Sequence, residues 1–478
     1  MTITNKQIKI FLKTYLNYNW FFYKRSEIEM KIHTIGGYNE VGKNMTVVEL
    51  ADDAIIFDAG FYMPAIVEMQ EEENSTHQEY TEKKLRNNGA LPDDVFVQKL
   101  GLRNKIRAIL LGHAHLDHIG AVPYTSYRYN APVVGTPFTI SVLKKIMEDA
   151  KIKIPNKISP VNPNSTFIVK GKKRNYRAEF INITHSTLQT SMIALHTPEG
   201  IVLYANDFKI DNTPVLGLPP NYQALKRIAK QGVKVLIVDS LYSGDNKKTP
   251  SEKVARALVE EVLLTIKNEK NAVFVSTFSS HIARIKSIVD FSEKLGRKVY
   301  VIGRSMNKYI SSAKEVGICP FKNKITLGSY KRQVESILKQ VSKNKEKSLV
   351  ICTGHQGEPG SILDRLSRGK LPFEFKQGDN VIFSSKTIPV PVNIANKENL
   401  DKRLKKIGVR IFDDVHVSGH GGREDLRDII SIVNPEHIIP SHGSTQQLTP
   451  MIELAKEMGY VAGKNCHLLH DSQEITLK

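Results

Sequence analysis

The chain has 478 residues, of which 41% are hydrophobic and 24% charged, and its 68 Lys and Arg against 49 Asp and Glu give a net charge of +19. This composition suits two or three globular domains and excludes collagen-like, coiled-coil and wholly disordered chains. No stretch approaches the ~18 uninterrupted apolar residues of a membrane span, so no membrane partner is expected. Three widely spaced cysteines do not make a disulfide framework and favour a reducing cytoplasm.

Residues 1–29 differ from the rest of the chain. The segment Ile8–Tyr23 is rich in aromatic residues, but Lys9 and Lys13 interrupt it and no small-residue cleavage site follows, which argues against a signal peptide. We expect an N-terminal extension that is not native or is loosely ordered, with the natural start at Met30. An amphipathic helix for a surface or a partner is the alternative.

From Met30 onward, short β-rich apolar runs alternate with segments of helical period, and this alternation predicts an α/β fold. A strand, a turn and a second strand are expected directly after Met30. The strands expected next are Met45–Leu50, Ala54–Phe57, Ile106–Leu111, Pro132–Val134, Glu179–Ile183, Ile193–His196, Ile201–Tyr204 and Val233–Val238.

A second alternating set occupies the middle of the chain. Its expected strands are Ala272–Ser276, Lys298–Ile302, Ser348–Cys352 and Asn380–Ser384, with helices near 251–267, 280–295 and 331–342. Residues 241–410 hold 33 Lys and Arg against 16 Asp and Glu, so +17 of the net charge lies there. This positive charge indicates either a solvated lysine-rich surface or a surface that binds a polyanion.

A third, shorter set of strands is expected at Val409–Phe412, His437–Pro440 and Cys466–His470. The basic segment therefore looks like a domain inserted between two parts of another. We expect an extension over 1–29, a first domain part over 30–244, the inserted domain over 245–415 and a return segment over 416–478.

The most informative motif is GHAHLDH, residues 112–118, which follows an expected strand. His113 and His115 are two residues apart and lie on the same side of an extended segment, whereas Asp117 and His118 follow once the chain begins to turn. Imidazole nitrogens and carboxylate oxygens in such a cluster suit zinc.

Other candidate ligands also follow expected strands, and strand ends of an α/β sheet meet at one edge. Seven groups are expected to converge there: His113, His115, Asp117, His118, His185, Asp207 and His442. They exceed the needs of one tetrahedral zinc and suit two Zn²⁺ ions per chain with Asp207 as the bridge. Two such ions generate hydroxide from water and stabilise displacement at phosphorus.

With these motifs the chain resembles the metallo-β-lactamase fold, an αββα sandwich. Asp239 at the end of VKVLIVD and the motif HVSGH at residues 416–420 narrow the resemblance to the β-CASP nucleases, whose inserted α/β domain matches the basic segment. The strings KIHTIGGYNEVGKNMT, TFSSHIARIK, VIGRSM, TGHQGEPGSIL and HVSGHGG are similar to the ribonuclease J family, and more closely to its archaeal branch. The resemblance covers residues 30–478.

The resemblance implies roles for these residues. One metal ion would take His113, His115 and His185 and the other Asp117, His118 and His442, with Asp58 orienting a ligand. Asp117 would assist as a proton acceptor, and His420, oriented by Asp239, would donate a proton to the leaving 3′-oxygen.

The same resemblance implies a substrate and a direction of attack. The substrate would be single-stranded RNA, degraded mainly 5′→3′ from a 5′-monophosphate, with endonuclease action as a further possibility, and the protein would be a cytoplasmic homodimer. A phosphate pocket is expected from Ser280, His281 and Ile282, where a helix begins, and from His416, Val417, Ser418, Gly419 and His420.

Alternatives remain at this stage. They are a DNA nuclease of the same superfamily, a small-molecule metallo-hydrolase with the same histidine motif, and an RNA-binding protein without activity. Two positions depart from the family pattern: Asp239 stands where the archaeal branch often has Glu, and Ser444 stands where a Glu is usual.

Overall fold

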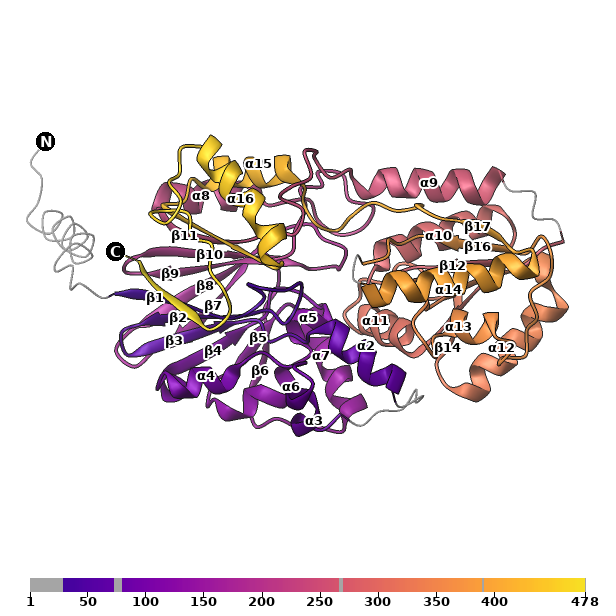
Figure 1. The fold of residues 1–478 in the computed structure, drawn as a ribbon, viewed down its shortest axis with the longest axis horizontal. Coiled ribbons are helices and arrows are strands. Elements are labelled where there is room, and N and C mark those ends of the chain that lie inside the picture. Colours follow the sequence, from indigo (N-terminus) through magenta and orange to yellow (C-terminus); the bar gives the residue numbers. More distant parts are fainter. Residues whose placement is uncertain (1–28, 73–79, 266–269, 389–390, 478) are drawn as a thin grey trace, which may run out of the picture.

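The computed structural model describes residues 29–72, 80–265, 270–388 and 391–477. The extension expected over residues 1–29 therefore lies outside the described residues, apart from Glu29. Figure 1 shows two α/β bodies, one built from both ends of the chain and the other, in orange, from its middle.

The first body contains two sheets. The seven-stranded sheet has the order β19-β1-β2-β3-β4-β5-β6 and the six-stranded sheet the order β18-β11-β10-β9-β8-β7. The strands of the first sheet are β1 Met30–Gly36, β2 Met45–Leu50, β3 Asp53–Phe57, β4 Ile106–Leu110, β5 Val133–Gly135, β6 Ile158–Pro160 and β19 Gln473–Leu477. Those of the second are β7 Ser165–Lys170, β8 Asn175–Asn182, β9 Ser191–Thr197, β10 Gly200–Ala205, β11 Val233–Asp239 and β18 His437–Ser441.

Most strands of these sheets are buried on both faces, which explains their continuous apolar runs, whereas β7 at the edge of the second sheet is largely exposed. In β3, Ile55 and Phe57 enter the core between the two sheets, whereas Ala54 and Ile56 face the opposite side. Because side chains alternate along a strand, one run of four apolar residues serves two cores.

Helices cover the outer faces of both sheets. Those of the first part of the chain are α2 Met63–Glu72, α3 Glu82–Asn87, α4 Asp94–Lys99, α5 Leu116–Ile119, α6 Val122–Thr125, α7 Pro137–Ala150 and α8 Tyr222–Gln231, and those after the inserted domain are α15 Arg423–Val433 and α16 Thr445–Glu457. Short 3-10 helices lie at Arg103–Lys105, Ser126–Arg128 and, in the inserted domain, Lys345–Lys347. Helices α8, α15 and α16 pack on the second sheet and α4 and α7 on the first, so the expected αββα sandwich is confirmed. No helix within the described ranges has the length and apolarity to cross a membrane.

The inserted domain is built on a third sheet of six parallel strands in the order β14-β13-β15-β12-β16-β17. Its strands are β12 Val273–Ser276, β13 Lys298–Ile302, β14 Ile325–Gly328, β15 Ser348–Cys352, β16 Asn380–Phe383 and β17 Arg410–Phe412. Its helices are α9 Glu252–Thr265, α10 Ile282–Lys294, α11 Arg304–Glu315, α12 Lys331–Lys343, α13 Ile362–Ser367 and α14 Pro391–Ile407. Helices α9 to α11 pack on one face and α12 to α14 on the other.

Most expected strands are present, but one prediction was wrong. The segment Cys466–His470 is not a strand, because Cys466 forms only isolated bridges to Ile438 and Ala462. The last strand is Gln473–Leu477, which pairs with β1 at the sheet edge, Met30 opposite Leu477. Sequence analysis also did not identify β6, β7, β14 and β19, and it gave ranges only for the helices α9, α10 and α12.

A buried arginine connects two helices of the inserted domain with the residue that precedes the return segment. Arg284 of α10 is fully buried and binds both carboxylate oxygens of Glu252, at 2.6 and 2.9 Å. Its remaining nitrogen donates to the carbonyls of Ser384, at 3.0 Å, and Val415, at 3.2 Å. One side chain therefore connects α9, the end of β16 and the segment that leads into residues 416–420.

Removing the positive partner of this pair should destabilise the fold. We expect Arg284→Met to lower the free energy of unfolding by about 3–5 kcal/mol, because Glu252 stays buried without its partner. Denaturant unfolding followed by circular dichroism measures this.

The matched control is Arg256→Met on the same pair of helices. Arg256 of α9 pairs with Asp290 of α10 at 2.7 Å, with side-chain exposures of 29% and 22%. Its loss should cost only about 0–1 kcal/mol. If both variants lost the same free energy of unfolding, the buried pair would contribute no more to stability than the partly exposed one.

Candidate metal centre

The candidate site lies where strands of both sheets end. Asp58 follows β3, residues 113–118 follow β4, Asp207 follows β10 and His442 follows β18. Three of these residues, Asp58, Asp207 and His442, have positive φ angles of 58°, 58° and 64°. Such left-handed backbone is costly for residues with a Cβ and is often found at functional sites.

Three groups of potential ligand atoms share the carboxylate of Asp207; two of them hold the predicted ligands, and the third consists of Asp207, Asp239 and His420. The first comprises His113, His115, His185 and Asp207, and the second comprises Asp117, His118, Asp207 and His442; within each, the ligand atoms lie within 4.8 Å of one another. The structure thus brings together all seven residues predicted as ligands, in the expected two sets. Their role as metal ligands stays a prediction.

The donor atoms fit metal ions. His115 Nδ1 lies 3.1 Å from His113 Nε2 and 3.2 Å from His185 Nε2. Asp207 is buried, and its Oδ1 accepts no hydrogen bond from the described residues. Nε2 of His113 and Nε2 of His118 approach the other oxygen of this carboxylate, Oδ2, at 3.4 and 3.2 Å. Imidazole nitrogens that converge on a buried carboxylate are suited to hold a cation between them.

The opposite nitrogen of each of three rings has a partner that fixes the orientation. His118 Nδ1 lies 2.7 Å from Asp58 Oδ2, and His185 Nδ1 lies 2.7 Å from the Gly419 carbonyl. His115 Nε2 lies 3.0 Å from Ser280 Oγ. Because carboxylates and carbonyls only accept, Nδ1 of His118 and His185 carries the proton, and Nε2 is the nitrogen of each ring that would bind a metal ion.

Electrostatics divide the histidines into two groups. Burial lowers the pKa of His113 to about 3 and that of His185 well below its usual value, so both rings are neutral. Burial also opposes the charge of His118, but Asp207, Asp117 and Asp58 outweigh it and raise that pKa well above its usual value. The second cluster is therefore the more negatively charged of the two, and a divalent cation would take the place of the proton on His118.

Sequence analysis missed a set of polar residues behind the second cluster. Asn44 Nδ2 lies 2.9 Å from His442 Nδ1 and 3.0 Å from His118 Nε2. Asn206 donates to Asn44 Oδ1 at 3.0 Å, and Tyr204 donates to Asp58 Oδ2 at 2.9 Å. The only sequence signal was position, since Asn44 precedes β2 and Asn206 precedes Asp207.

His420 and Asp239 form a pair beside the clusters. His420 Nδ1 lies 2.7 Å from Asp239 Oδ2, and Nε2 lies 4.0 Å from Asp207 Oδ2. Burial alone would lower the pKa of His420, but the charges of Asp239 and Asp207 prevail and raise it to about 9. A protonated imidazole held in this way can deliver a proton to a nearby atom.

The residues predicted to bind phosphate have protein partners in this structure. His281 caps α10 by accepting from the Arg284 amide at 3.3 Å, and Ile282 lies in the hydrophobic core. His416 lies 3.3 Å from Arg284, and burial lowers its pKa to about 2. Val417 is buried.

Two further residues of the predicted phosphate loop, Ser418 and Gly419, have their partners near the metal centre. Ser418 Oγ accepts from the His420 amide at 3.0 Å, and Gly419 lies against His185 and Ser186. The absence of a side chain at Gly419 therefore serves close contact with protein, and the phosphate-binding role of residues 416–420 and 280–282 stays a prediction.

Family models match the chain in three consecutive stretches. Residues 38–238 match the metallo-β-lactamase superfamily, residues 270–403 the ribonuclease J β-CASP domain and residues 406–469 the Zn-dependent metallo-hydrolase RNA specificity domain. Fold and site thus define a metallo-hydrolase of the metallo-β-lactamase superfamily with an inserted β-CASP domain.

Two archaeal relatives match almost end to end. Ribonuclease J of Methanocaldococcus jannaschii is 41% identical over 94% of this chain and 99% of its own length. Ribonuclease J of Pyrococcus abyssi is 40% identical over 94% and 98%. The chain belongs to the ribonuclease J family. A crystal structure of an Enterococcus faecalis V583 protein of unknown function shares the fold, with a TM-score of 0.63, 17% identity and coverage of 94% of this chain and all of that one.

Gly419 should not tolerate a side chain. A Cβ there would lie 2.9 Å from Ser186 Cβ and 3.1 Å from His185 Cε1. We expect Gly419→Ala to displace His185 and to weaken metal binding by about 10- to 100-fold, because partners that orient ligands typically have this effect. Metal titration of the apoprotein measures it.

Gly112→Ala is the matched control beside the same centre. A Cβ at Gly112 would make ordinary contacts, 3.6 Å to the Ser191 carbonyl oxygen and 3.8 Å to Asp58. This variant should bind metal like the parent. Weakening of the same size in both variants would show that the contact at Gly419 has no special role.

Proposed function

We propose that the protein is a zinc-dependent ribonuclease that hydrolyses single-stranded RNA, mainly 5′→3′ from a 5′-monophosphorylated end. The observation that carries the proposal is the pair of ligand clusters sharing Asp207, with His420 4.0 Å from the shared carboxylate. Membership of the ribonuclease J family supports RNA as the substrate.

Two zinc ions are the proposed cofactors. His113, His115 and His185 would hold one, Asp117, His118 and His442 the other, and Asp207 would bridge them. Nitrogen and carboxylate ligands of this kind suit zinc. Two bound ions lower the pKa of water and stabilise charge that develops at phosphorus.

The protein's own groups would then move protons. Asp117, one-fifth exposed at 19%, is placed to accept a proton at the open side of the second cluster. His420, held by Asp239, would protonate the leaving 3′-oxygen. Asp239 would orient the ring and favour its protonated form, so that His420 itself would serve as the general acid.

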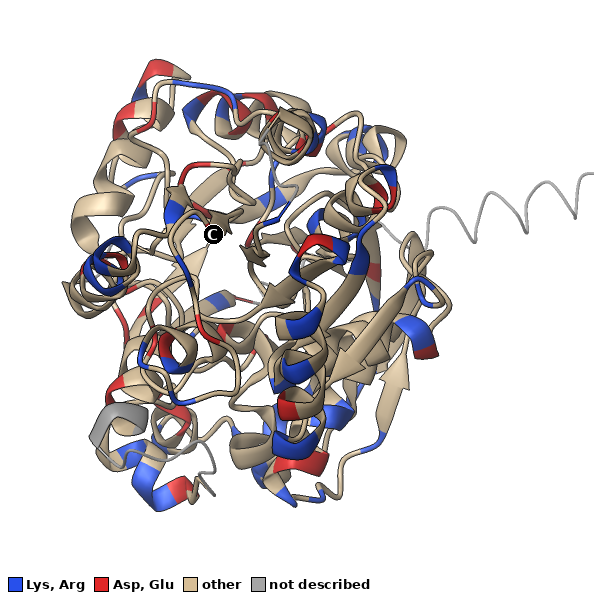
Figure 2. Ribbon diagram, turned by 90° about the vertical axis from the view of Figure 1, so that its right-hand side faces the viewer, with Lys and Arg blue, Asp and Glu red and all other residues tan. Residues whose placement is uncertain are grey.

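The inserted domain would bind the RNA backbone. Residues 241–410 hold +17 of the net charge of +19. Figure 2, viewed from the inserted-domain end, shows Lys and Arg spread over several helices of this face. A concentrated positive field attracts a polyanion, which supports RNA over a small neutral substrate.

The proposed preference for a 5′-monophosphate takes Ser280 and residues 416–420 to form a small pocket beyond the clusters. Ser280 Oγ contacts the ligand His115, and the carbonyl of Gly419, within that loop, contacts the ligand His185. A closed pocket of hydroxyl and amide donors would admit one phosphate and exclude a triphosphate by size and charge. We further propose a cytoplasmic homodimer; the buried free thiols of Cys319, Cys352 and Cys466 agree with a reducing compartment.

His420→Ala should separate proton delivery from metal binding. We expect it to fold and to keep both metal ions but to turn RNA over about 10²–10⁴-fold more slowly, as is usual when a general acid is lost. Elemental analysis and single-turnover cleavage of the same sample measure both properties.

His196→Ala is the control, because His196 lies on β9 and pairs with Glu179 at 3.5 Å, outside the clusters. It should cleave RNA at the parent rate. Loss of one metal ion from His420→Ala would instead make His420 a ligand.

The direction of cleavage is tested with one RNA labelled separately at each end, in 5′-monophosphate and 5′-triphosphate forms. We expect immediate release of labelled mononucleotide from the 5′-labelled monophosphate form and little from the triphosphate. Metal analysis accompanies the assay, and a DNA of the same sequence tests the alternative substrate. Equal rates on both 5′ forms, or internal fragments without mononucleotide, would contradict the proposed direction.

A further inference from the structure

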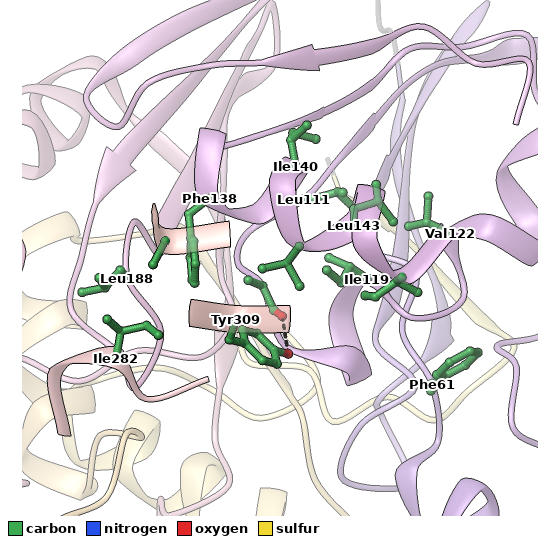
Figure 3. Close-up of a cluster of buried hydrophobic side chains, with 14 of the residues drawn as sticks. Phe61, Leu111, Ile119, Val122, Phe138, Ile140, Leu143, Leu188, Ile282 and Tyr309 are labelled. Atoms are coloured by element: carbon green, nitrogen blue, oxygen red, sulfur yellow. Dashed lines mark hydrogen bonds between the residues drawn. The ribbon is translucent and has the colours of Figure 1, made fainter. Parts of the chain in front are cut away.

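The inserted domain reaches the loop that carries two of the proposed ligands. The hydroxyl of Tyr309, on α11, donates to the backbone carbonyl of Ala114 at 2.9 Å. Ala114 stands between His113 and His115. Figure 3 shows this bond as a dashed line, with the Tyr309 ring lying in a cluster of apolar side chains.

The first domain satisfies neighbouring carbonyls of the same loop. The Gly112 carbonyl accepts from the Ser191 amide at 3.0 Å, and the His115 carbonyl accepts from the His118 amide at 3.1 Å. The Ala114 carbonyl differs because its donor belongs to the inserted domain. A buried carbonyl that loses its donor is costly, so this bond restrains the loop.

Tyr309 is itself held firmly at the boundary between the two domains. It is 5% exposed, and its ring centroid lies 6.4 Å from that of Phe138 of α7. Two polar contacts hold α11 against α7: Glu315 accepts from Ser141 at 2.7 Å, and Lys308 pairs with Asp149 at 2.6 Å. Burial raises the pKa of Tyr309, so the hydroxyl keeps its proton and remains a donor.

The two ligand clusters differ in what supports them. In the first, His115 contacts Ser280 of the inserted domain and the adjacent carbonyl is bound by Tyr309. In the second, His118 is oriented by Asp58 and contacts Asn44, both of the first domain. Support from the inserted domain is therefore directed at the first cluster.

We propose that Tyr309 is a positioning residue that fixes residues 113–115, so that the first cluster holds its metal ion tightly only when the inserted domain is docked. The second cluster keeps its metal ion independently of Tyr309. This inference rests on the proposed function, because it takes both clusters to be metal sites.

The test compares metal release from the zinc-loaded parent, Tyr309→Phe and Tyr460→Phe. Tyr460 is the matched control, since its hydroxyl also donates to a backbone carbonyl, that of Pro435 at 2.8 Å, which lies before the start of β18 whereas His442 follows its end. Each protein is mixed with a chromogenic chelator in excess, and the amplitude and rate of each release phase are recorded. Circular dichroism of the same samples establishes that the variants are folded.

We expect one equivalent of zinc to leave Tyr309→Phe about 10- to 100-fold faster than the parent, the usual effect of removing a group that orients ligands. The second equivalent should leave at the parent rate, and Tyr460→Phe should match the parent in both phases. Ser280→Ala, which removes the other contact from the inserted domain, should accelerate the same equivalent.

Parent rates for both equivalents in Tyr309→Phe, or equal acceleration of both, would overturn the positioning role. A parent that holds fewer than two zinc ions would overturn the proposed two-metal centre, and the positioning role with it. The two failures are distinguishable because the first appears only in the variants and the second already in the parent.

Discussion

The site depends on a single buried carboxylate. Asp207 lies in both ligand clusters, and its Oδ1 accepts no hydrogen bond from the described residues. A buried charge of this kind is tolerated only when positive charge or a metal ion compensates it. Its backbone has φ of 58°, a conformation that the surrounding strands must hold in place. Both sheets must therefore be folded before the Asp207 carboxylate can face the ligands of both clusters.

Much of the centre could be predicted from the sequence because its ligands follow strands. The run ending at Leu110 is buried on both faces, so the residues directly after it were expected at the sheet edge. The structure brings them together there with residues that follow β10 and β18. The Cys466–His470 segment had a similar apolar composition, yet it lacks a pairing partner along its length. Composition alone does not distinguish these cases, because strand formation depends on a neighbour.

The supporting residues could not be predicted, because their contacts join positions far apart in the chain. Asn44 and His442 are separated by 398 residues, and Tyr309 and Ala114 by 195. An isolated Asn after a glycine-rich turn is usually a turn residue, and a Tyr in an amphipathic helix is usually core. Only the docking of separate elements gives these side chains their contacts with the metal centre.

The edge of the first sheet has a consequence for biosynthesis. β1 pairs on one side with β2 and on the other with β19, so Met30 lies opposite both Leu50 and Leu477. While the chain emerges from the ribosome, β1 presents an open edge until the last strand is made, and His442 is also still missing. A nascent chain can therefore acquire most of its first sheet early, but the centre is complete only once His442 has emerged, and β1 is covered only once β19 has paired with it. Truncated translation products would combine an exposed strand with an incomplete site, which favours their aggregation and degradation over unregulated cleavage of RNA.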